Sequence, residues 1–332
     1  MDSNAPSRPF RVATYKKAER LLAALRGLSW RAREIGVAWI FRGQGLANTW
    51  KLLPSAYRPD RFTKSAAAAR AHRRALDTAK VSPWEHWCGM ADAPANVSEA
   101  EWRRCVEHGA SEAFAHSFVL REFVLLADRA NQPIRVPTAL WHLPNPEMGY
   151  LANLVKGVEP YEVIDPVVAV AQHHGIPTPL LDWSYSPVVA AYFAAEQSLE
   201  RGTGEPLAVW ALHEDYLNTQ SAAIKRLTIQ SHATPYRDAQ EGLFTWHPGA
   251  YLHLSDGEYR PFDKVIEADL GNSGTTRTML WKFTLPASEA HMLFKILVAE
   301  RVSRAHLMPG FDNVAADLEL QAKWGTYLPP GR

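Results

Sequence analysis

Arg42 stands at the end of an apolar run and is followed by a glycine. The run is Val37-Ala38-Trp39-Ile40-Phe41, a pattern typical of a short buried strand, and Gly43 comes next. Burying an arginine is costly unless its guanidinium meets an anion or a carboxylate. Two interpretations follow and both stay open. Arg42 is either a clamp for a phosphate or carboxylate on a ligand, or one half of a structural ion pair with an acid such as Asp182.

A second concentration of chemistry lies in residues 171–195, AQHHGIPTPLLDWSYSPVVAAYFAA. Pro177 and Pro179 exclude a helix through the corner that follows the two histidines. Ser186 and Pro187 then provide an N-cap and a first helical residue, so a buried helix is expected from Pro187 to about Leu199. A short strand that leads into a capped helix presents backbone N–H groups to an anion.

The two histidines of this stretch, His173 and His174, are adjacent, so in an extended chain they face opposite ways and at most one enters a site. Further potential metal ligands exist in Asp182, His247 and His253, but no spacing matches a known zinc pattern. We expect no metal site. Asp182 is interpreted as a cap or as a partner for Arg42.

The charge is unevenly distributed along the 332 residues. Residues 1–80 hold 17 Lys and Arg against 5 Asp and Glu, a net charge of +12, whereas the whole chain has a formal net charge of +1. The asymmetry favours a basic face that could meet a phosphate-rich partner such as nucleic acid. The alternative is that the basic and acidic parts pair within the fold.

Composition places the chain among ordinary globular proteins, with 47% hydrophobic and 21% charged residues. Cys88 and Cys105 have neither metal nor redox spacing, which indicates a reducing compartment. No signal peptide is expected from the sequence, and no apolar run in it is near the length of a membrane span. A cytoplasmic location is expected.

Periodicity predicts the elements that must position these residues. Amphipathic patterns predict helices, and plain apolar runs predict strands. The expected helices are 13–35, 63–80, one that begins after Ser98, 112–130, 289–300 and 314–324. The expected strands are 37–41, 207–212 and 279–285, whereas the first dozen residues form a loose arm and residues 221–253 are loop-rich. The pattern is that of one α+β domain with a helical insertion at about 60–160.

Three separated segments together resemble the FRG-domain family, which is named for a Phe-Arg-Gly motif. They are WIFRGQ at 39–44, AQHHGIPTPLLDWSYSPVVAAYFA at 171–194 and RDAQEGLFTWH at 237–247. One departure is Pro179, where the family pattern leads us to expect an arginine. If that arginine binds a ligand in relatives, this chain lacks one contact.

A weaker similarity, in motif order and shape, is to ADP-ribosyltransferases. It implies a split mixed β-sheet that resembles the fold of those enzymes. It also implies an NAD-dependent transfer of ADP-ribose, with NAD as substrate and a nucleic acid or a protein as acceptor, of the kind used by toxins and defence effectors. On this analogy the dinucleotide and its nicotinamide would be held by Arg42, Gly43, Gln44, Asp182, Trp183, Ser184 and Tyr192. The catalytic candidates are Glu241, Gln240 and His174.

The chemistry needs a held pyrophosphate, an aromatic ring to stack on nicotinamide and a carboxylate to stabilise an oxocarbenium ion. Glu241 could supply the carboxylate, whereas Gln240 cannot act as a base. The alternative is a non-catalytic module that binds a nucleotide or nucleic acid. In both cases residues 1–36 are predicted as a basic arm and helix, and residues 37–332 as the FRG-type domain. We expect Arg42, His174, Asp182, Ser184 and the Gln240-Glu241 pair to meet in one site.

Overall fold

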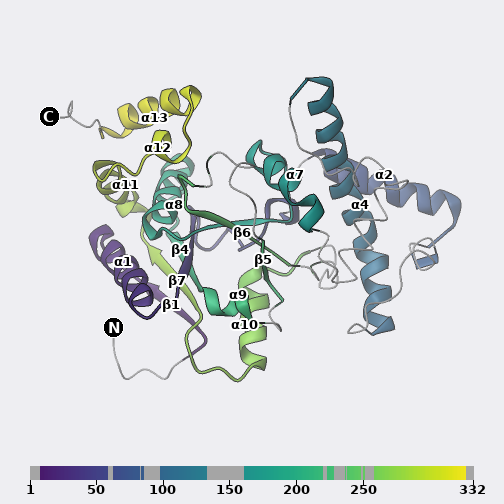
Figure 1. The fold of residues 1–332 in the computed structure, drawn as a ribbon, viewed down its shortest axis with the longest axis horizontal. Helices are drawn as coiled ribbons and strands as arrows, with labels where there is room; N and C mark the ends of the chain where they lie inside the picture. The colour runs from purple at the N-terminus through teal and green to yellow at the C-terminus, as the bar shows by residue number, and fades with distance from the viewer. Residues whose placement is uncertain are drawn as a thin grey trace.

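A seven-stranded mixed β-sheet with helices on both faces forms the centre of the molecule (Figure 1). The computed structural model describes residues 8–58, 63–82, 84–85, 98–132, 161–219, 223–227, 236, 238–247, 250 and 258–326. The strands are β1 (Phe10–Thr14), β2 (Trp39–Gln44), β3 (Leu181–Ser184), β4 (Leu207–His213), β5 (Lys225–Leu227), β6 (Gly242–Trp246) and β7 (Leu280–Leu285). Their order across the sheet is β1-β7-β4-β2-β3-β6-β5, and β1 pairs with β7 in parallel while the other described pairs are antiparallel.

Helices account for most of the remaining described chain. They are α1 (Ala18–Glu34), α2 (Thr63–Ala79), α4 (Glu99–Arg129), α7 (Tyr161–His173), α8 (Pro187–Arg201), α9 (Glu214–Asn218), α10 (Phe262–Asn272), α11 (Ala290–Ala299), α12 (Arg304–Leu307) and α13 (Phe311–Trp324). Two short 3-10 helices, η1 (Ser55–Tyr57) and η4 (Ala287–Glu289), complete the set. The α+β class expected from the sequence is confirmed.

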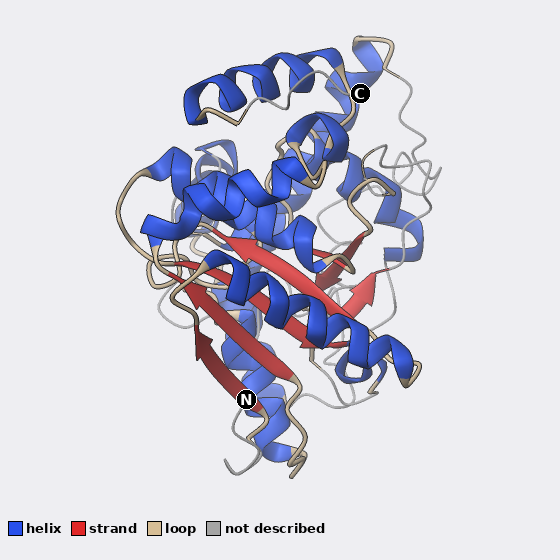
Figure 2. Cartoon of the chain, turned by 90° about the vertical axis from the view of Figure 1, so that its left-hand side faces the viewer, coloured by secondary structure: helices blue, strands red, loops and turns tan. Residues whose placement is uncertain are grey.

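Two hydrophobic clusters hold the layers together because the central strands are buried on both faces. Alternate residues of β2 point to opposite sides, so that Phe41 joins one cluster and Ile40 joins the other. The first cluster lies between the sheet and helices α1, α8 and α11, and the second lies between the sheet and helices α9 and α10. Figure 2 shows helices laid across one face of the sheet. Strand β4 is buried at all seven positions, as a strand covered on both faces should be.

The helical elements α2 and α4 lie on the other side of the molecule from α1 (Figure 1). They pack against each other through Ala68, Ala69 and Ala115, small residues that let the two helix backbones approach. Both fall within the insertion expected at about 60–160, of which residues 60–62, 83, 86–97 and 133–160 lie outside the described part of the chain.

Several predicted elements need correction. Residues 10–14, which the sequence analysis assigns to a loose arm and the start of a helix, form β1, whose partner strand lies about 270 residues further on. The two helices expected after Ser98 and over 112–130 are one continuous helix, α4, because no proline divides them and a single helical glycine costs only about 1 kcal/mol. The loop-rich region at 221–253 contains strands β5 and β6. Helix α10 was not predicted.

The helix expected from Pro187 is confirmed. Ser186 has the extended backbone of an N-cap residue and Pro187 is the first helical residue, although the Ser186 side chain makes no capping hydrogen bond. The helix ends at Gly202, whose φ of 62° is the left-handed conformation that glycine adopts most readily. The predicted strands at 207–212 and 279–285 correspond to β4 and β7.

His213 gives the fold a predictable response to acid. Its side chain is 2% exposed, and its Nδ1 accepts a hydrogen bond of 3.2 Å from the backbone N–H of Asp215 at the start of α9. Burial, followed by the nearby cation of Arg277, lowers the pKa of His213. The unfolded chain therefore takes up a proton at a higher pH than the folded chain does, so the folded state loses stability as the pH falls below about 6.5.

We expect the free energy of unfolding of the wild type to fall more steeply than that of His213→Gln between about pH 7 and about pH 5, by up to about 1.4 kcal/mol per pH unit. Urea denaturation at several pH values measures both slopes. Equal slopes in the two proteins would show that His213 does not carry this acid sensitivity.

Candidate ligand-binding site

The sheet opens between β2 and β3. Among the described residues these strands pair only at Phe41 and Ser184, while β2 stays paired with β4 up to Gln44 and β3 stays paired with β6 along its whole length. The strands therefore separate directly beyond Phe41, where Arg42 begins. This opening lets the Arg42 side chain reach across to β3.

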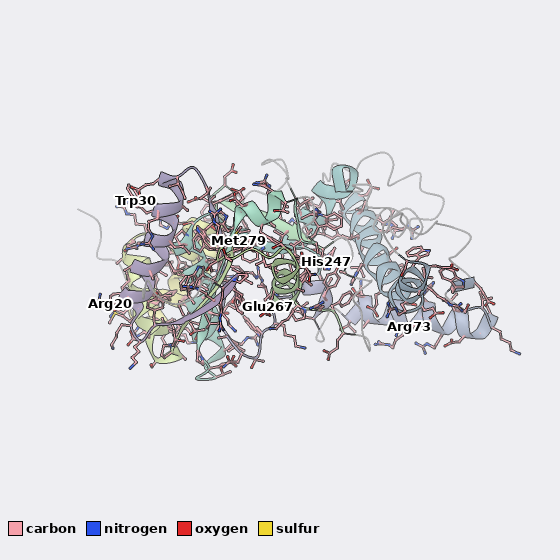
Figure 3. All side chains as sticks on the ribbon, turned by 90° about the horizontal axis from the view of Figure 1, so that it is seen from below. Arg20, Trp30, Arg73, His247, Glu267 and Met279 are labelled. Carbon is pink, nitrogen blue, oxygen red and sulfur yellow. The ribbon has the colours of Figure 1, made fainter. Side chains whose placement is uncertain are left out.

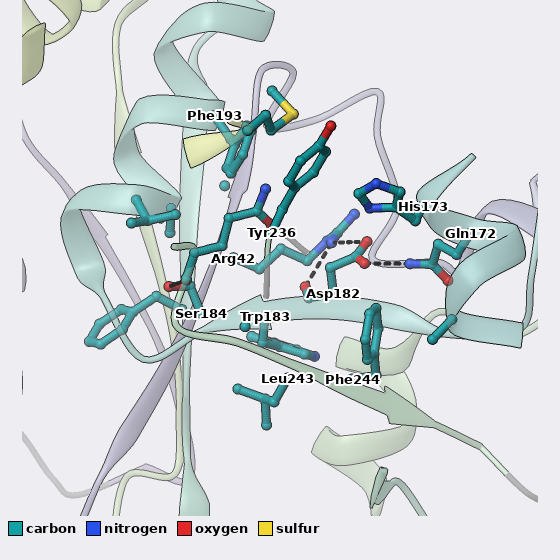
Figure 4. A pocket seen from close by; sticks show the side chains of 18 of the residues that line it. Arg42, Gln172, His173, Asp182, Trp183, Ser184, Phe193, Tyr236, Leu243 and Phe244 are labelled. Atoms are coloured by element: carbon teal, nitrogen blue, oxygen red, sulfur yellow. Dashed lines mark hydrogen bonds and ion pairs between the residues drawn. The ribbon is translucent and has the colours of Figure 1, made fainter. Parts of the chain in front are cut away.

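A cavity of about 340 Å³ lies at this opening (Figure 4). Its walls come from strands β2, β3 and β6, from one end of α7, from the first turns of α8, and from residues before β6 and after α12. The lining residues are Phe41, Arg42, Gly43, Ala169, Gln172, His173, Asp182, Trp183, Ser184, Val189, Ala190, Phe193, Gln197, Tyr236, Gln240, Gly242, Leu243, Phe244 and Met308. The volume is within the range of pockets that hold small molecules, about 300–1,000 Å³.

Arg42 is the cation of this cavity. Its side chain is 15% exposed, and a single nitrogen, Nη1, donates to the backbone oxygen of Asp182 at 2.7 Å and lies 3.4 Å from the Oδ2 atom of the same residue. The Nε atom is buried and has no hydrogen-bond partner among the described residues. Burial lowers the pKa of Arg42, the charge of Asp182 raises it, and the charge of Arg58 lowers it further. The guanidinium is thus incompletely paired, which favours an additional anion.

Asp182 is held by a chain of polar contacts. Its side chain is 56% exposed, and its Oδ1 accepts a hydrogen bond from Gln172 Nε2 (Figure 4). Gln172 Oε1 in turn accepts from the hydroxyl of buried Thr178. The backbone of Thr178 is tied to η1, since its N–H donates to Ser55 Oγ at 3.1 Å. The carboxylate beside Arg42 is therefore fixed from helix α7.

Aromatic and imidazole rings form much of the rest of the wall. Tyr236, Phe193 and Phe244 line the cavity, and the rings of His173 and Tyr236 have their centroids 4.2 Å apart. Burial lowers the pKa of His173, and the adjacent His174 lowers it further, so His173 is mainly neutral near pH 7. A neutral imidazole can accept a hydrogen bond from a ligand, and the flat rings can contact a planar group.

The structure brings six of the ten predicted site residues to the cavity wall. They are Arg42, Gly43, Asp182, Trp183, Ser184 and Gln240. The side chains of two of these six residues are held by hydrogen bonds within the fold. The Trp183 indole N–H donates to Thr245 Oγ1 at 2.8 Å, and the indole is only 3% exposed. Ser184 Oγ donates to the Gln240 carbonyl at 2.6 Å and accepts from the Ser186 N–H at 2.9 Å, which fixes the step from β3 into α8.

Four predicted residues do not line the cavity. His174, the first residue after α7, is exposed, and its neighbour His173 lines the cavity instead. Gln44 is buried, and its Oε1 accepts a hydrogen bond from Trp210 Nε1 at 2.7 Å instead of facing the cavity. Tyr192, a residue of α8, is fully buried, and its hydroxyl donates to Glu196.

Glu241 is the fourth of these residues. Its half-exposed carboxylate lies 3.9 Å from Arg33 Nη2, on α1, whereas the neighbouring Gln240 lines the cavity. The φ of Glu241 is 47°, a turn conformation that directs consecutive side chains to different sides. The expectation that Gln240 and Glu241 enter the site together is therefore wrong for Glu241 in this conformation.

Sequence reasoning missed Gln172, His173, Phe193, Tyr236 and Met308 as lining residues. A signal existed for the first two, because Ala169, Gln172 and His173 have the spacing of one helix face. Tyr236 directly precedes the 237–247 motif, whereas Met308 gave no such signal, since it follows α12 far away in the sequence.

The described basic residues of the N-terminal quarter do not gather on a single face. Helices α1 and α2 lie at opposite ends of the molecule, as Arg20 and Arg73 show in Figure 3. Some of these charges also have partners within the fold: Lys17 Nζ lies 2.8 Å from Glu289, and Arg73 Nη2 lies 3.4 Å from Glu112. Among the described residues, the positive charges of the +12 segment are therefore spread over distant parts of the molecule rather than gathered on one surface.

Fold and cavity together define an α+β domain with a small-molecule-sized site at an opening of its sheet. The family model of the FRG domain matches residues 146–202, a range that contains all of α7, β3 and α8. This match agrees with the resemblance to the FRG-domain family that the sequence motifs indicated. No curated protein and no solved structure matches the chain.

Two further searches of the described residues bear on the type of site. No group of three or more His, Cys, Asp or Glu side chains in the described part of the chain is arranged to hold a metal ion. Within the same residues, no helix has both the length and the apolar character that crossing a membrane requires.

Proposed function

We propose that the cavity at Arg42 binds a nucleotide-class ligand, with NAD as the first candidate. The observation that carries the proposal is a guanidinium that is largely buried, has one long ionic contact of 3.4 Å, and lies in a cavity with aromatic walls. Arginine is the side chain best suited to hold phosphate oxygens, and flat aromatic rings suit a base or a nicotinamide. Val189 and Ala190 of the first turns of α8 also line the cavity, so a bound anion would lie near a helix N-terminus.

Isothermal titration calorimetry with NAD, ADP-ribose, AMP, nicotinamide and inorganic phosphate tests this proposal. We expect NAD and ADP-ribose to bind more tightly than either isolated fragment, because only the larger ligands use both the cation and the aromatic wall. Absence of binding by every nucleotide at millimolar concentration would refute it.

ADP-ribosyl transfer from NAD to a nucleic acid or protein is the second candidate. One feature favours it: Asp182 places a half-exposed carboxylate in the cavity wall beside the cation. In such a reaction the bond between ribose and nicotinamide breaks, nicotinamide leaves with the bonding electrons, and an acceptor nucleophile forms the new bond and loses its proton. A carboxylate next to the ribose would stabilise the positive charge that develops.

Labelled NAD incubated with cell extract separates binding from transfer. Nicotinamide release and label transfer that fall at least about 100-fold in Asp182→Asn would support the second candidate. NAD binding without nicotinamide release over hours would leave a binding module, the alternative that the sequence already raised.

Gln240 and Glu241 provide a matched pair of variants. Gln240 lines the cavity and its Nε2 donates to the Leu307 carbonyl at 3.1 Å, whereas Glu241 faces Arg33 outside the cavity. We expect Gln240→Ala to weaken NAD binding by about 5-fold to 10-fold, close to the loss of one hydrogen bond, and Glu241→Gln to leave it within about 2-fold. Calorimetry on both variants measures the difference. A larger loss in Glu241→Gln would show that the 240–241 turn rearranges when ligand binds.

A further inference from the structure

Asp182 and Arg42 are adjacent but do not form the usual two-pronged pair. Arginine–carboxylate pairs commonly make two parallel hydrogen bonds of about 2.7–2.9 Å. Here a single guanidinium nitrogen approaches a single carboxylate oxygen, at 3.4 Å, and the strong bond from that nitrogen goes to the Asp182 backbone oxygen instead. The side chain of Asp182 is 56% exposed, so packing does not prevent the carboxylate from turning further toward Arg42.

The contact that restrains the carboxylate comes from Gln172. Its Nε2 donates to Asp182 Oδ1, the oxygen that a two-pronged pair would need (Figure 4). The orientation of the Gln172 amide follows from which of its neighbours can donate a hydrogen bond and which can only accept one. The Asp182 carboxylate can only accept a hydrogen bond, so the amide nitrogen of Gln172 must face it. Gln172 Oε1 then faces Thr178, whose hydroxyl donates to it while accepting from the Leu180 N–H at 3.3 Å.

We infer that Gln172 is a positioning residue that holds the Asp182 carboxylate back from Arg42 and thereby keeps the guanidinium available to an anionic ligand. The inference rests on the proposed function. Without Gln172, the carboxylate closes onto the guanidinium with both oxygens and competes with the phosphate of a ligand. Gln172 thus sets the affinity of the site without having to touch the anion itself.

A ligand-free measurement tests the positioning step separately from the function. In a crystal structure of Gln172→Leu we expect both Asp182 carboxylate oxygens within about 3 Å of guanidinium nitrogens of Arg42. Gln197→Leu is the matched control, since Gln197 lines the same cavity but donates nothing to Asp182 and accepts instead from the Gly45 N–H at 3.1 Å. A carboxylate that stays where it is in Gln172→Leu would overturn the inference, even if NAD binds.

The consequence for affinity is tested by a double-mutant cycle with NAD as the probe. We expect Gln172→Leu to weaken NAD binding about 10-fold, and the same change to have no more than about a 2-fold effect in the Asp182→Asn background, because the competing charge is already gone. A loss that is equal in both backgrounds would show that Gln172 acts by another route and would refute the proposal. If Gln172→Leu does not fold, Thr178→Val removes the hydroxyl that orients the amide and gives the same readouts.

The two failures are distinguishable. If the carboxylate closes onto Arg42 in Gln172→Leu but wild-type protein binds no nucleotide, the positioning step is correct and the proposed function is not. If wild-type protein binds NAD but the carboxylate does not move in the variant, the proposed function survives and the role of Gln172 does not.

Discussion

Replacing Gly43 by alanine is expected to destabilise the protein by at least about 3 kcal/mol, a large part of the 5–15 kcal/mol that holds a typical domain together. An added Cβ would lie 2.0 Å from the Ala190 carbonyl oxygen and 2.7 Å from the Ala194 backbone nitrogen. Both atoms belong to the backbone of α8, so no side-chain rotation relieves the overlap. The helix would have to move off β2 and leave the core cluster that Phe41 and Tyr192 share.

Gly271 is the matched control for this substitution. It lies in the last turn of α10, no atom comes within 4 Å of an added Cβ, and its φ is not positive. Gly271→Ala should be neutral or stabilising by up to about 1 kcal/mol, because alanine favours the helix. Chemical denaturation of both variants measures the contrast. A loss of less than about 1 kcal/mol in Gly43→Ala would contradict the close approach of α8 to β2.

The glycine of the Phe-Arg-Gly motif thus has a structural explanation. Phe41 is fully buried in the core, Arg42 turns into the cavity where β2 and β3 separate, and Gly43 lets α8 lie directly on the strand. Each of the three residue types is required at its position for a different physical reason.

Arg42→Ala is expected to weaken NAD binding by about 100-fold or more while the protein stays folded. The variant removes the cation of the cavity but keeps the apolar residues of β2 that hold the strand in the core. The remaining Asp182 is half exposed and stays hydrated, and removing Arg42 also eliminates a buried, unpartnered Nε. We therefore expect the free energy of unfolding to change by less than about 1 kcal/mol.

Arg42→Lys should restore little of the binding, because an ammonium group cannot reproduce the planar guanidinium. Arg33→Ala serves as control, since Arg33 is exposed and faces Glu241 outside the cavity. Calorimetry gives the affinities, and urea denaturation gives the stabilities. A collapse of stability in Arg42→Ala, with little change in binding, would favour the structural ion pair with Asp182 over the ligand clamp.

The chemistry could be anticipated where local sequence determines local structure. Ser186 and Pro187 mark the start of α8, and an apolar run ending in Arg42 marks β2, so the cation and the helix N-terminus were predictable. The joining of β1 to the sheet was not, because this strand has only five residues, none of them fully buried, and its partner β7 lies far away in the sequence.

The direction in which side chains point was the other feature that could not be predicted from the sequence. Glu241 and His174 each stand next to a residue that lines the cavity, and only the φ of 47° at Glu241 and the end of α7 at His173 decide which neighbour faces it. Tyr192 has the composition of a stacking residue, yet it falls on the core side of α8. Such choices depend on tertiary packing rather than on local pattern.

A crystal structure of the protein soaked with NAD is the most direct test of the central claim that the opening between β2 and β3 is a nucleotide site. We expect density for the ligand in the cavity, with a phosphate oxygen within about 3 Å of the Arg42 guanidinium and a ring against Tyr236 or Phe244. An empty cavity at a saturating NAD concentration, or NAD bound on another face of the domain, would contradict the account.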